Sequence, residues 1–309
     1  MKRIIKILFI SILIILSVFS TNASIVSELY PDFEFESEYD NSFAVSAYNG
    51  SKGEVYIPES IYDREVKRFS QKAFYNNTAL TLLYMHDKMT VVNKWAFRSC
   101  PGLSVVYFSK NTSALWDFAF AQNPKLKCAL IGNTKISTLY QSAFYKCSSL
   151  EYLSLPDTLK NINPSAFEKT SVKSVVIPEN VTSIKTRAFA DNGNLREVYI
   201  PEGVEKFGED IFSGCENVKI YVIANSPAEK YCVENALNYE VVEKDKFPSK
   251  INGDVDNDGK LSIRDITTMQ MNLAQIDCGF LSQNCDFNAD CDFNINDVTA
   301  AQRKALETL

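Results

Sequence analysis

The feature that most constrains the fold is a dipeptide, Ala-Phe, which returns through the middle of the chain at a nearly constant interval. It occurs at Ala73-Phe74, Ala96-Phe97, Ala119-Phe120, Ala143-Phe144, Ala166-Phe167 and Ala188-Phe189, with Ile211-Phe212 as a variant. The steps between successive pairs are 23, 23, 24, 23, 22 and 23 residues. A unit of this size cannot bury its apolar side alone, so the repeats predict a stack of similar coils.

An apolar pattern of the form L-x-x-L-x-L begins six or seven residues after each pair. Its members are Leu80/Leu83/Met85, Leu103/Val106/Phe108, Leu126/Ala129/Ile131, Leu150/Leu153/Leu155, Val172/Val175/Ile177, Leu195/Val198/Ile200 and Val218/Tyr221/Ile223. We expect these residues to point inward from short parallel strands, and the Ala-Phe pairs to pack the return side. Period and pattern are those of leucine-rich repeats, so the predicted fold is mainly β, a solenoid of short parallel strands.

The unit from Glu179 to Pro201 closely resembles the BspA-type leucine-rich repeat. The resemblance covers about residues 33–240. It implies a surface or secreted protein that acts in binding or adhesion, without a catalytic centre in the repeats. We expect residues 24–69 to cap the N-terminal end with strands at 43–45 and 54–58. Residues 70–243 would hold the repeats and a C-terminal cap that is helical over 228–232.

The outward strand positions carry apolar and tyrosine side chains. The candidate ligand face consists of Tyr84, Tyr107, Leu130, Tyr152, Val176 and Tyr199. Such a surface is typical of contact sites for a protein or a glycan. The alternative is that these side chains only stabilise neighbouring strands.

Three of the eight cysteines, Cys100, Cys147 and Cys215, occupy the same place in their units as an asparagine does in others. They lie too many coils apart to form disulfides with one another, whereas a Cys215–Cys232 bond remains open. His86 is the chain's one histidine, and no third catalytic member accompanies a Cys–His86 pair. Few groups are therefore available for imidazole-dependent catalysis.

Residues 1–23 have the layout of a signal peptide: three cations, an apolar run over residues 7–19 and small residues up to Ala23. The run is shorter than the roughly 20 residues of a membrane span, so export is favoured over a retained anchor. The net charge of -6 argues against nucleic acid as a partner.

Two acidic segments of twelve residues, 32 residues apart, place oxygen donors where a calcium-binding loop needs them. The predicted ligands are Asp254, Asp256, Asp258, Lys260 (through its carbonyl), Ser262 and Asp265, then Asp286, Asn288, Asp290, Asp292, Asn294 and Asp297. An Asp/Asn-rich turn is the alternative for one loop, but the second copy favours two Ca²⁺ sites. Cys291 stands where glycine allows the sharp turn at Gly259, so we expect weaker binding in the second loop.

The duplicated loop and helix over residues 252–309, after a linker at 244–251, resemble a type I dockerin, a small all-α EF-hand-like module. The resemblance implies binding to a cohesin module of a scaffoldin, typically in a cellulosome. The cohesin contacts that it implies are Ile263, Arg264, Met271, Ile295, Asn296 and Arg303.

Together these features predict a secreted, non-catalytic binding protein on a cellulosome or cell surface, with a solenoid that contacts an unknown protein or glycan. One alternative is a free or cell-surface adhesin whose C-terminal module only stabilises its end. Another is a carbohydrate-active enzyme component, which is disfavoured because repeats and caps fill the rest of the chain.

Overall fold

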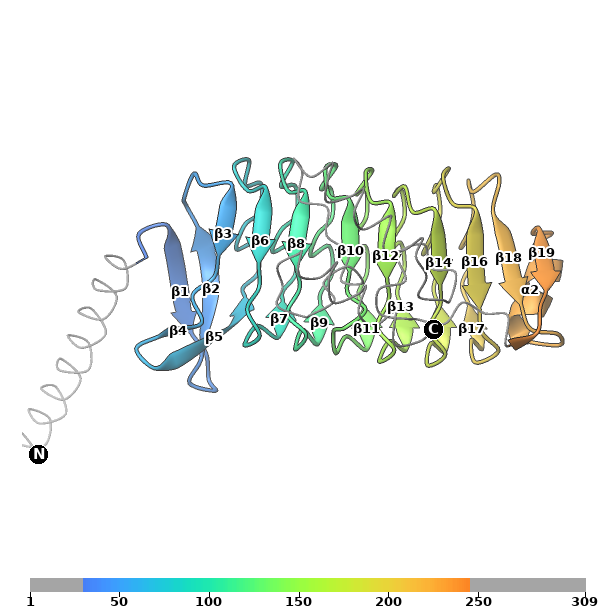
Figure 1. Ribbon diagram of the computed structural model, residues 1–309, viewed down its shortest axis with the longest axis horizontal. Coiled ribbons are helices and arrows are strands. Elements are labelled where there is room, and N and C mark those ends of the chain that lie inside the picture. The colour runs from blue at the N-terminus through green and yellow to red at the C-terminus, as the bar shows by residue number, and fades with distance from the viewer. Residues whose placement is uncertain (1–29, 245–309) are drawn as a thin grey trace, which may run out of the picture.

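Each repeat forms one coil, and each coil contributes two short strands to two different faces of the stack (Figure 1). The computed structural model describes residues 30–244. The strands of one face lie side by side along the whole stack in Figure 1, with the shorter strands of the other face below them. Because every coil repeats the same path, this arrangement carries one continuous core from end to end.

The first face, called here the long-strand face, comprises three parallel ladders: β3-β6-β8, β10-β12 and β14-β16-β18-β19. Its strands are β3 (Glu54–Tyr56), β6 (Leu82–Tyr84), β8 (Val105–Tyr107), β10 (Cys128–Leu130), β12 (Tyr152–Ser154), β14 (Ser174–Val176), β16 (Glu197–Ile200), β18 (Lys219–Val222) and β19 (Tyr239–Val241). Successive strands join neighbouring coils in register, as the pairing of Leu83 with Val106 shows.

The second face is a ten-stranded sheet in the order β1-β2-β5-β7-β9-β11-β13-β15-β17, with β4 beside β5. Its strands are β1 (Phe33–Ser37), β2 (Phe43–Tyr48), β4 (Ser60–Ile61), β5 (Arg64–Phe69), β7 (Val91–Val92), β9 (Ala114–Leu115), β11 (Thr138–Leu139), β13 (Asn161–Ile162), β15 (Ser183–Ile184) and β17 (Lys206–Phe207). All pairs from β2 onward along this path are parallel.

The ends of the stack break the repeat. At the N-terminal end β1 and β2 form an antiparallel pair, and the strands expected at 43–45 and 54–58 are present as β2 and β3. At the other end the helix α2 (Pro227–Glu234) includes the expected helical residues 228–232. Ser226 caps it, because its hydroxyl accepts the N–H of Glu229 at 3.2 Å, and Pro227 suits the first helical position. The ring of Tyr231 stacks on Phe207 at 4.7 Å and closes the core.

The phenylalanines of the Ala-Phe pairs form a continuous stack through the core. Seven ring pairs, from Tyr48–Phe74 to Phe189–Phe212, have centroids between 4.8 and 6.0 Å apart. The alanine beside each phenylalanine is also buried, which lets adjacent coils approach closely. Each aromatic pair contributes roughly 0.5–1.5 kcal/mol beyond the burial of its apolar area. The prediction that these pairs pack the return side is confirmed.

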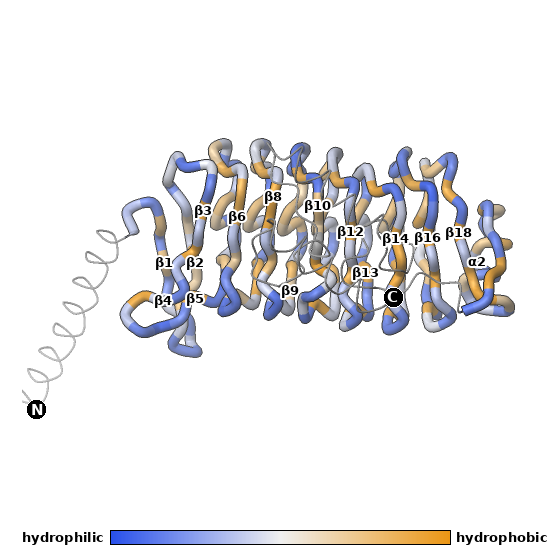
Figure 2. The backbone as a smooth tube through the Cα atoms, viewed as in Figure 1, coloured by the Kyte–Doolittle hydropathy of each residue, from blue (hydrophilic) through white to orange (hydrophobic). Residues whose placement is uncertain are grey.

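The inward positions of the strands agree with the expected pattern in the first six units. Their members are buried, apart from Leu153, which is partly buried. In the seventh unit the prediction is wrong: Ile220 and Val222 point inward, and Tyr221 lies outward beside Tyr199. The unit is one residue shorter between Val218 and its strand, so pairing with β16 shifts the register and turns the tyrosine outward. Figure 2 shows the hydrophobic stretches recurring from coil to coil.

Each return segment, the eight residues from three before the alanine to three after the phenylalanine, holds two residues in the left-handed region. In the second coil these are Trp95 and Ser99, both at φ 62°. Such a conformation costs a non-glycine residue about 1–2 kcal/mol. Here it aims the N–H groups at the next coil, where Trp95 donates to Asp117 O at 3.1 Å and Ser99 to Ala121 O at 2.9 Å. The stack therefore compensates a strain that a single coil could not hold.

The place shared by cysteine and asparagine, here called the interior slot, is a hydrogen-bonding position between coils. The thiols of Cys100, Cys147 and Cys215 donate to the carbonyl of the preceding coil's phenylalanine at 3.0–3.2 Å. Asn123 and Asn192 reach the same carbonyl with their side-chain amides at 2.9 and 2.8 Å. The two residue types alternate because either one satisfies a buried carbonyl that would otherwise lack a donor.

Candidate ligand-binding face

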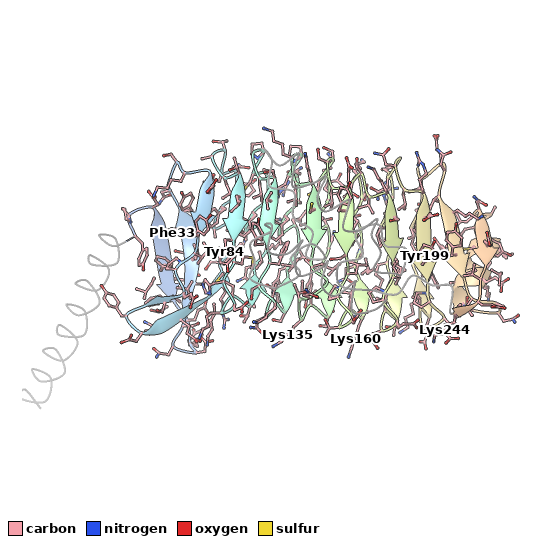
Figure 3. The ribbon with its side chains drawn as sticks, viewed as in Figure 1. Phe33, Tyr84, Lys135, Lys160, Tyr199 and Lys244 are labelled. Carbon is pink, nitrogen blue, oxygen red and sulfur yellow. The ribbon has the colours of Figure 1, made fainter. Side chains whose placement is uncertain are left out.

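The long-strand face presents two outward rows of side chains, because alternate residues of each strand point away from the core. The row at the third strand position, called here the tyrosine row, comprises Tyr56, Tyr84, Tyr107, Ser154, Val176, Tyr199 and Tyr221, and the backbone of Leu130 occupies the same strand position. The row at the first position comprises Glu54, Leu82, Val105, Cys128, Tyr152, Ser174, Glu197 and Lys219. Figure 3 labels Tyr84 and Tyr199 toward opposite ends of this face.

The predicted ligand face is only partly one row. Tyr84, Tyr107, Val176 and Tyr199 share the tyrosine row, and the backbone of Leu130 belongs to it, while its side chain lies outside what the structure describes. Tyr152 pairs with Cys128 and therefore belongs to the other row. Both positions point outward, but they are the first and third residues of each strand.

The N-terminal part of the tyrosine row is a run of three rings. Tyr56 lies 6.0 Å from Tyr84, and Tyr84 lies 6.1 Å from Tyr107, with interplanar angles of 37° and 50°. Tyr56 is 61% exposed, so the run is open to a ligand at its N-terminal end. Tilted rings of this kind expose edges and part of their faces, and each hydroxyl can donate or accept a hydrogen bond.

The C-terminal part of the row combines aromatic rings with charge. Tyr199 and Tyr221 are stacked at 4.5 Å, and the Tyr221 hydroxyl donates to Glu197 Oε1 at 3.4 Å. Burial, followed by the nearby charge of Glu197, raises the pKa of Tyr199 to about 12. Lys219 Nζ lies 2.6 Å from Glu240 and 5.5 Å from the Tyr221 ring. The two tyrosines therefore remain neutral hydroxyl groups near neutral pH.

Tyr152 occupies a different environment, between the two runs. It is 41% exposed, and Lys173 Nζ lies 5.8 Å above its ring while also forming an ion pair with Glu151 at 2.7 Å. Its neighbour in the tyrosine row is Ser154, so the rings do not form one uninterrupted ladder. The face consists of two aromatic clusters with a more polar centre.

Two residues of the row, Tyr56 and Tyr221, were missed by the sequence reasoning. Tyr56 stands before the first Ala-Phe pair, in a segment interpreted as a cap, and Tyr221 was assigned to an inward position. The alternation Glu54-Val55-Tyr56 around a buried valine was a usable signal for the first. The second required the pairing with β16.

The thiols and the histidine do not form a catalytic pair within the described part of the chain. His86 is buried and accepts the N–H of Lys88 through Nδ1 at 3.2 Å, whereas the slot thiols donate to phenylalanine carbonyls. Burial raises the pKa of Cys100 and Cys147 to about 12, which keeps them protonated and poorly nucleophilic. The Cys215–Cys232 bond is not formed, because both residues are free thiols.

The predicted calcium ligands at 254–265 and 286–297 and the cohesin contacts lie outside the described residues, as does the leader. Within residues 30–244 no group of three or more His, Cys, Asp or Glu side chains is placed to hold a metal ion. Over the same range there is no helix with the length and apolar character of a membrane span.

The stacked coils, the parallel strands and the repeated inward residues define a leucine-rich-repeat solenoid. The family model described as "BspA type Leucine rich repeat region" matches the chain in six copies, over residues 67–196 and 130–240. The chain belongs to the BspA-type leucine-rich-repeat family.

One solved structure shows the same fold. The T. pallidum leucine-rich-repeat protein TpLRR is 22% identical, with a TM-score of 0.58, and the match covers 69% of this chain and 96% of that one. A leucine-rich cell surface protein from Faecalibacterium prausnitzii A2-165 is 16% identical, with a TM-score of 0.39 and coverage of 69% and 94%. A search of curated proteins found no match.

Proposed function

We propose that this chain is a secreted binding protein that presents the long-strand face to a protein or glycan partner. The observation that carries the proposal is the tyrosine row, since large aromatic side chains that point outward from neighbouring strands are typical of contact surfaces. The rings come from five coils and are held by a rigid core, so a partner meets them without ordering a loop. This role calls for no catalytic group in the solenoid.

We further propose that residues 252–309 tether the chain to a cohesin-bearing scaffold in a calcium-dependent way, as a dockerin does. Support comes from the two acidic loops, each with oxygen donors at positions 1, 3, 5, 9 and 12. A site that does not exist in the unfolded chain turns calcium-binding energy into folding energy. Calcium would therefore order the module and create the cohesin-binding surface.

The test is capture of the full-length chain by a panel of cohesin modules, with calcium and with chelator. We expect calcium-dependent capture that is lost in the Asp254→Ala/Asp286→Ala variant, which removes the first ligand of each loop. Asp277→Ala, a carboxylate between the loops, serves as the matched control and should be captured like the parent chain.

If no cohesin captures the calcium-loaded chain, the result favours the alternative function, an adhesin whose C-terminal module only stabilises the end of the chain. A calorimetric titration separates the two cases, because binding of calcium without capture retains the metal sites and removes the tether. Turnover in a glycosidase or esterase screen would contradict the non-catalytic role.

A further inference from the structure

The return segments of the first four repeats carry exposed aromatic side chains that the tyrosine row does not include. Both tryptophans of the chain, Trp95 and Trp116, stand here. Trp116 is 40% exposed and stacks on Tyr140 of the next coil at 4.5 Å and 15°. Tyr75, in the first of these coils, is 39% exposed. Aromatic surface that gathers on one side in this way often marks a binding site.

The same four segments are basic, although the chain as a whole has a net charge of -6. Their cations are Lys72, Lys94, Arg98 and Lys146, and Asp117 is the one acidic residue among them. In the following three return segments the balance reverses, with three cations and four acidic residues. The net charge of this side is therefore positive only in its aromatic half.

The cations are held beside the rings. Lys72 and Lys94 place Nζ at 5.2 and 4.8 Å from the centre of the Trp95 ring, and the Arg98 guanidinium lies 5.5 Å from Phe118. These distances are those of cation–π contacts. Lys94 also forms an ion pair with Asp117 of the next coil at 3.6 Å. A ligand that combines anionic groups with apolar C–H surface would meet cations and a ring in the first two coils, and the stacked rings of Trp116 and Tyr140 in the next two.

A polar depression lies at the N-terminal end of this surface. It has a volume of about 460 Å³, and its lining includes Asn49, Ser51, Asn76 and Asn77 together with Lys72. Amide and hydroxyl groups both donate and accept hydrogen bonds, which suits a ligand rich in hydroxyl groups.

We propose that Lys72, Lys94, Trp95, Arg98, Trp116 and Tyr140, here called the aromatic–basic face, bind an anionic polysaccharide that runs along the solenoid axis. Neighbouring coils repeat at the strand spacing of about 4.8 Å, close to the length of one sugar unit in an extended chain. Successive sugars can thus meet equivalent positions of successive coils, with acid groups at the cations and hydroxyls in the depression. This site lies on a different side of the coil from the tyrosine row and does not depend on the proposed tether.

The test uses the full-length chain in a chelating buffer, so that calcium cannot act through the C-terminal module. The probes are polygalacturonate, dextran sulfate, uncharged dextran and poly-glutamate, with affinity measured by calorimetry. Tryptophan fluorescence gives a local readout, because both tryptophans belong to the aromatic–basic face. We expect an anionic polysaccharide to bind with a fluorescence change, and dextran and poly-glutamate to bind at least tenfold more weakly.

Two variants examine the two halves of the surface: Trp116→Ala/Tyr140→Ala removes the stacked rings, and Lys94→Gln/Arg98→Gln removes two charges. Each should weaken binding at least tenfold, and the charge variant should also flatten its salt dependence. The matched control is Lys135→Gln/Lys160→Gln, which removes two exposed lysines at the lower edge in Figure 3 and should stay within twofold of the parent. Unchanged urea midpoints verify that the variants are folded.

Binding confined to polygalacturonate would assign a carboxylated ligand, and binding confined to dextran sulfate a sulfated one; either supports the proposal. Equal affinity for poly-glutamate with the same variant effects would overturn it in favour of an acidic protein. Equal affinity for dextran, no affinity for either anionic polysaccharide, or indifference to both variants would also overturn it.

Discussion

Asn123 offers the sharpest check on how the coils are held together. It is fully buried in the interior slot, where Nδ2 donates to the carbonyls of Phe97 at 2.9 Å and Phe120 at 2.8 Å. Its Oδ1 accepts the N–H of Cys100 at 2.8 Å. One side chain thus satisfies three backbone groups from two coils.

Replacement of Asn123 by alanine leaves two of those groups, the Phe97 carbonyl and the Cys100 N–H, without a partner. The Phe120 carbonyl keeps the Cys147 thiol at 3.1 Å. An unsatisfied buried group costs about 1–3 kcal/mol, so Asn123→Ala should lower the free energy of unfolding by about 2–6 kcal/mol.

Asn123→Cys is the informative comparison, because the chain itself uses cysteine at this place in other coils. The new thiol can donate to the Phe97 carbonyl as Cys147 donates to Phe120. The Cys100 N–H loses its acceptor in both variants, so the two variants differ by one unsatisfied carbonyl. Asn123→Cys should therefore lower the free energy of unfolding by about 1–3 kcal/mol, less than Asn123→Ala does.

Urea unfolding followed by circular dichroism measures both values, with the m-value checked for constancy. Asn133→Ala, at an exposed asparagine, is the control and should change stability by less than about 0.5 kcal/mol. Each coil of a solenoid contacts only its neighbours, so unfolding can occur in two transitions. In that case each transition of the variant is compared with the corresponding transition of the parent chain. If alanine and cysteine at position 123 proved equally harmful, or alanine cost under about 1 kcal/mol, the hydrogen-bonding account of the slot would fail.

Two further outcomes follow from the same stack. A Cβ on Gly208 would lie 2.1 Å from the backbone nitrogen of Thr186, so Gly208→Ala should destabilise by about 1–3 kcal/mol in the same urea assay. Gly193→Ala, where a Cβ meets nothing within 4 Å, should leave the stability unchanged. Equal losses of stability in the two variants would contradict the steric argument. Burial raises the pKa of Cys147 from 9.0 to about 12, so the unfolded chain ionises first and stability falls between these pH values. The stability of Cys147→Ser should fall less steeply over this pH range than that of the parent chain. Identical slopes of stability against pH would contradict the argument that burial raises this pKa.

Much of the solenoid was predictable because its repeat is visible in the amino-acid sequence. The Ala-Phe interval and the inward apolar residues reflect a coil that must bury the same side each time, so six of the seven strand patterns were correct. The seventh failed at Tyr221, where one missing residue changes which side chain faces inward. Alternation within a strand does not reveal such a shift, whereas pairing with β16 does.

The candidate ligand face was predictable to a smaller extent. Alternation identified Tyr84, Tyr107 and Tyr199 as outward. Alignment of Leu153 with Leu83 in the repeat already puts Tyr152 at the place of Leu82, so its assignment to the same row was wrong, as its pairing with Cys128 shows. The repeat puts Lys72, Lys94 and Arg98 in the return segments. Only the structure shows that these cations lie beside the rings of Trp95 and Phe118, two residues on left-handed backbone.

The sequence by itself determined the repeat, its length and the residues that fill the core, because burial of apolar side chains depends on spacing along the chain. Only the tertiary structure decided that Tyr221 lies beside Tyr199, which thiols remain free and which cations lie beside aromatic rings. These features depend on contacts between coils, and the register of each coil is set by its pairing with the neighbouring coils.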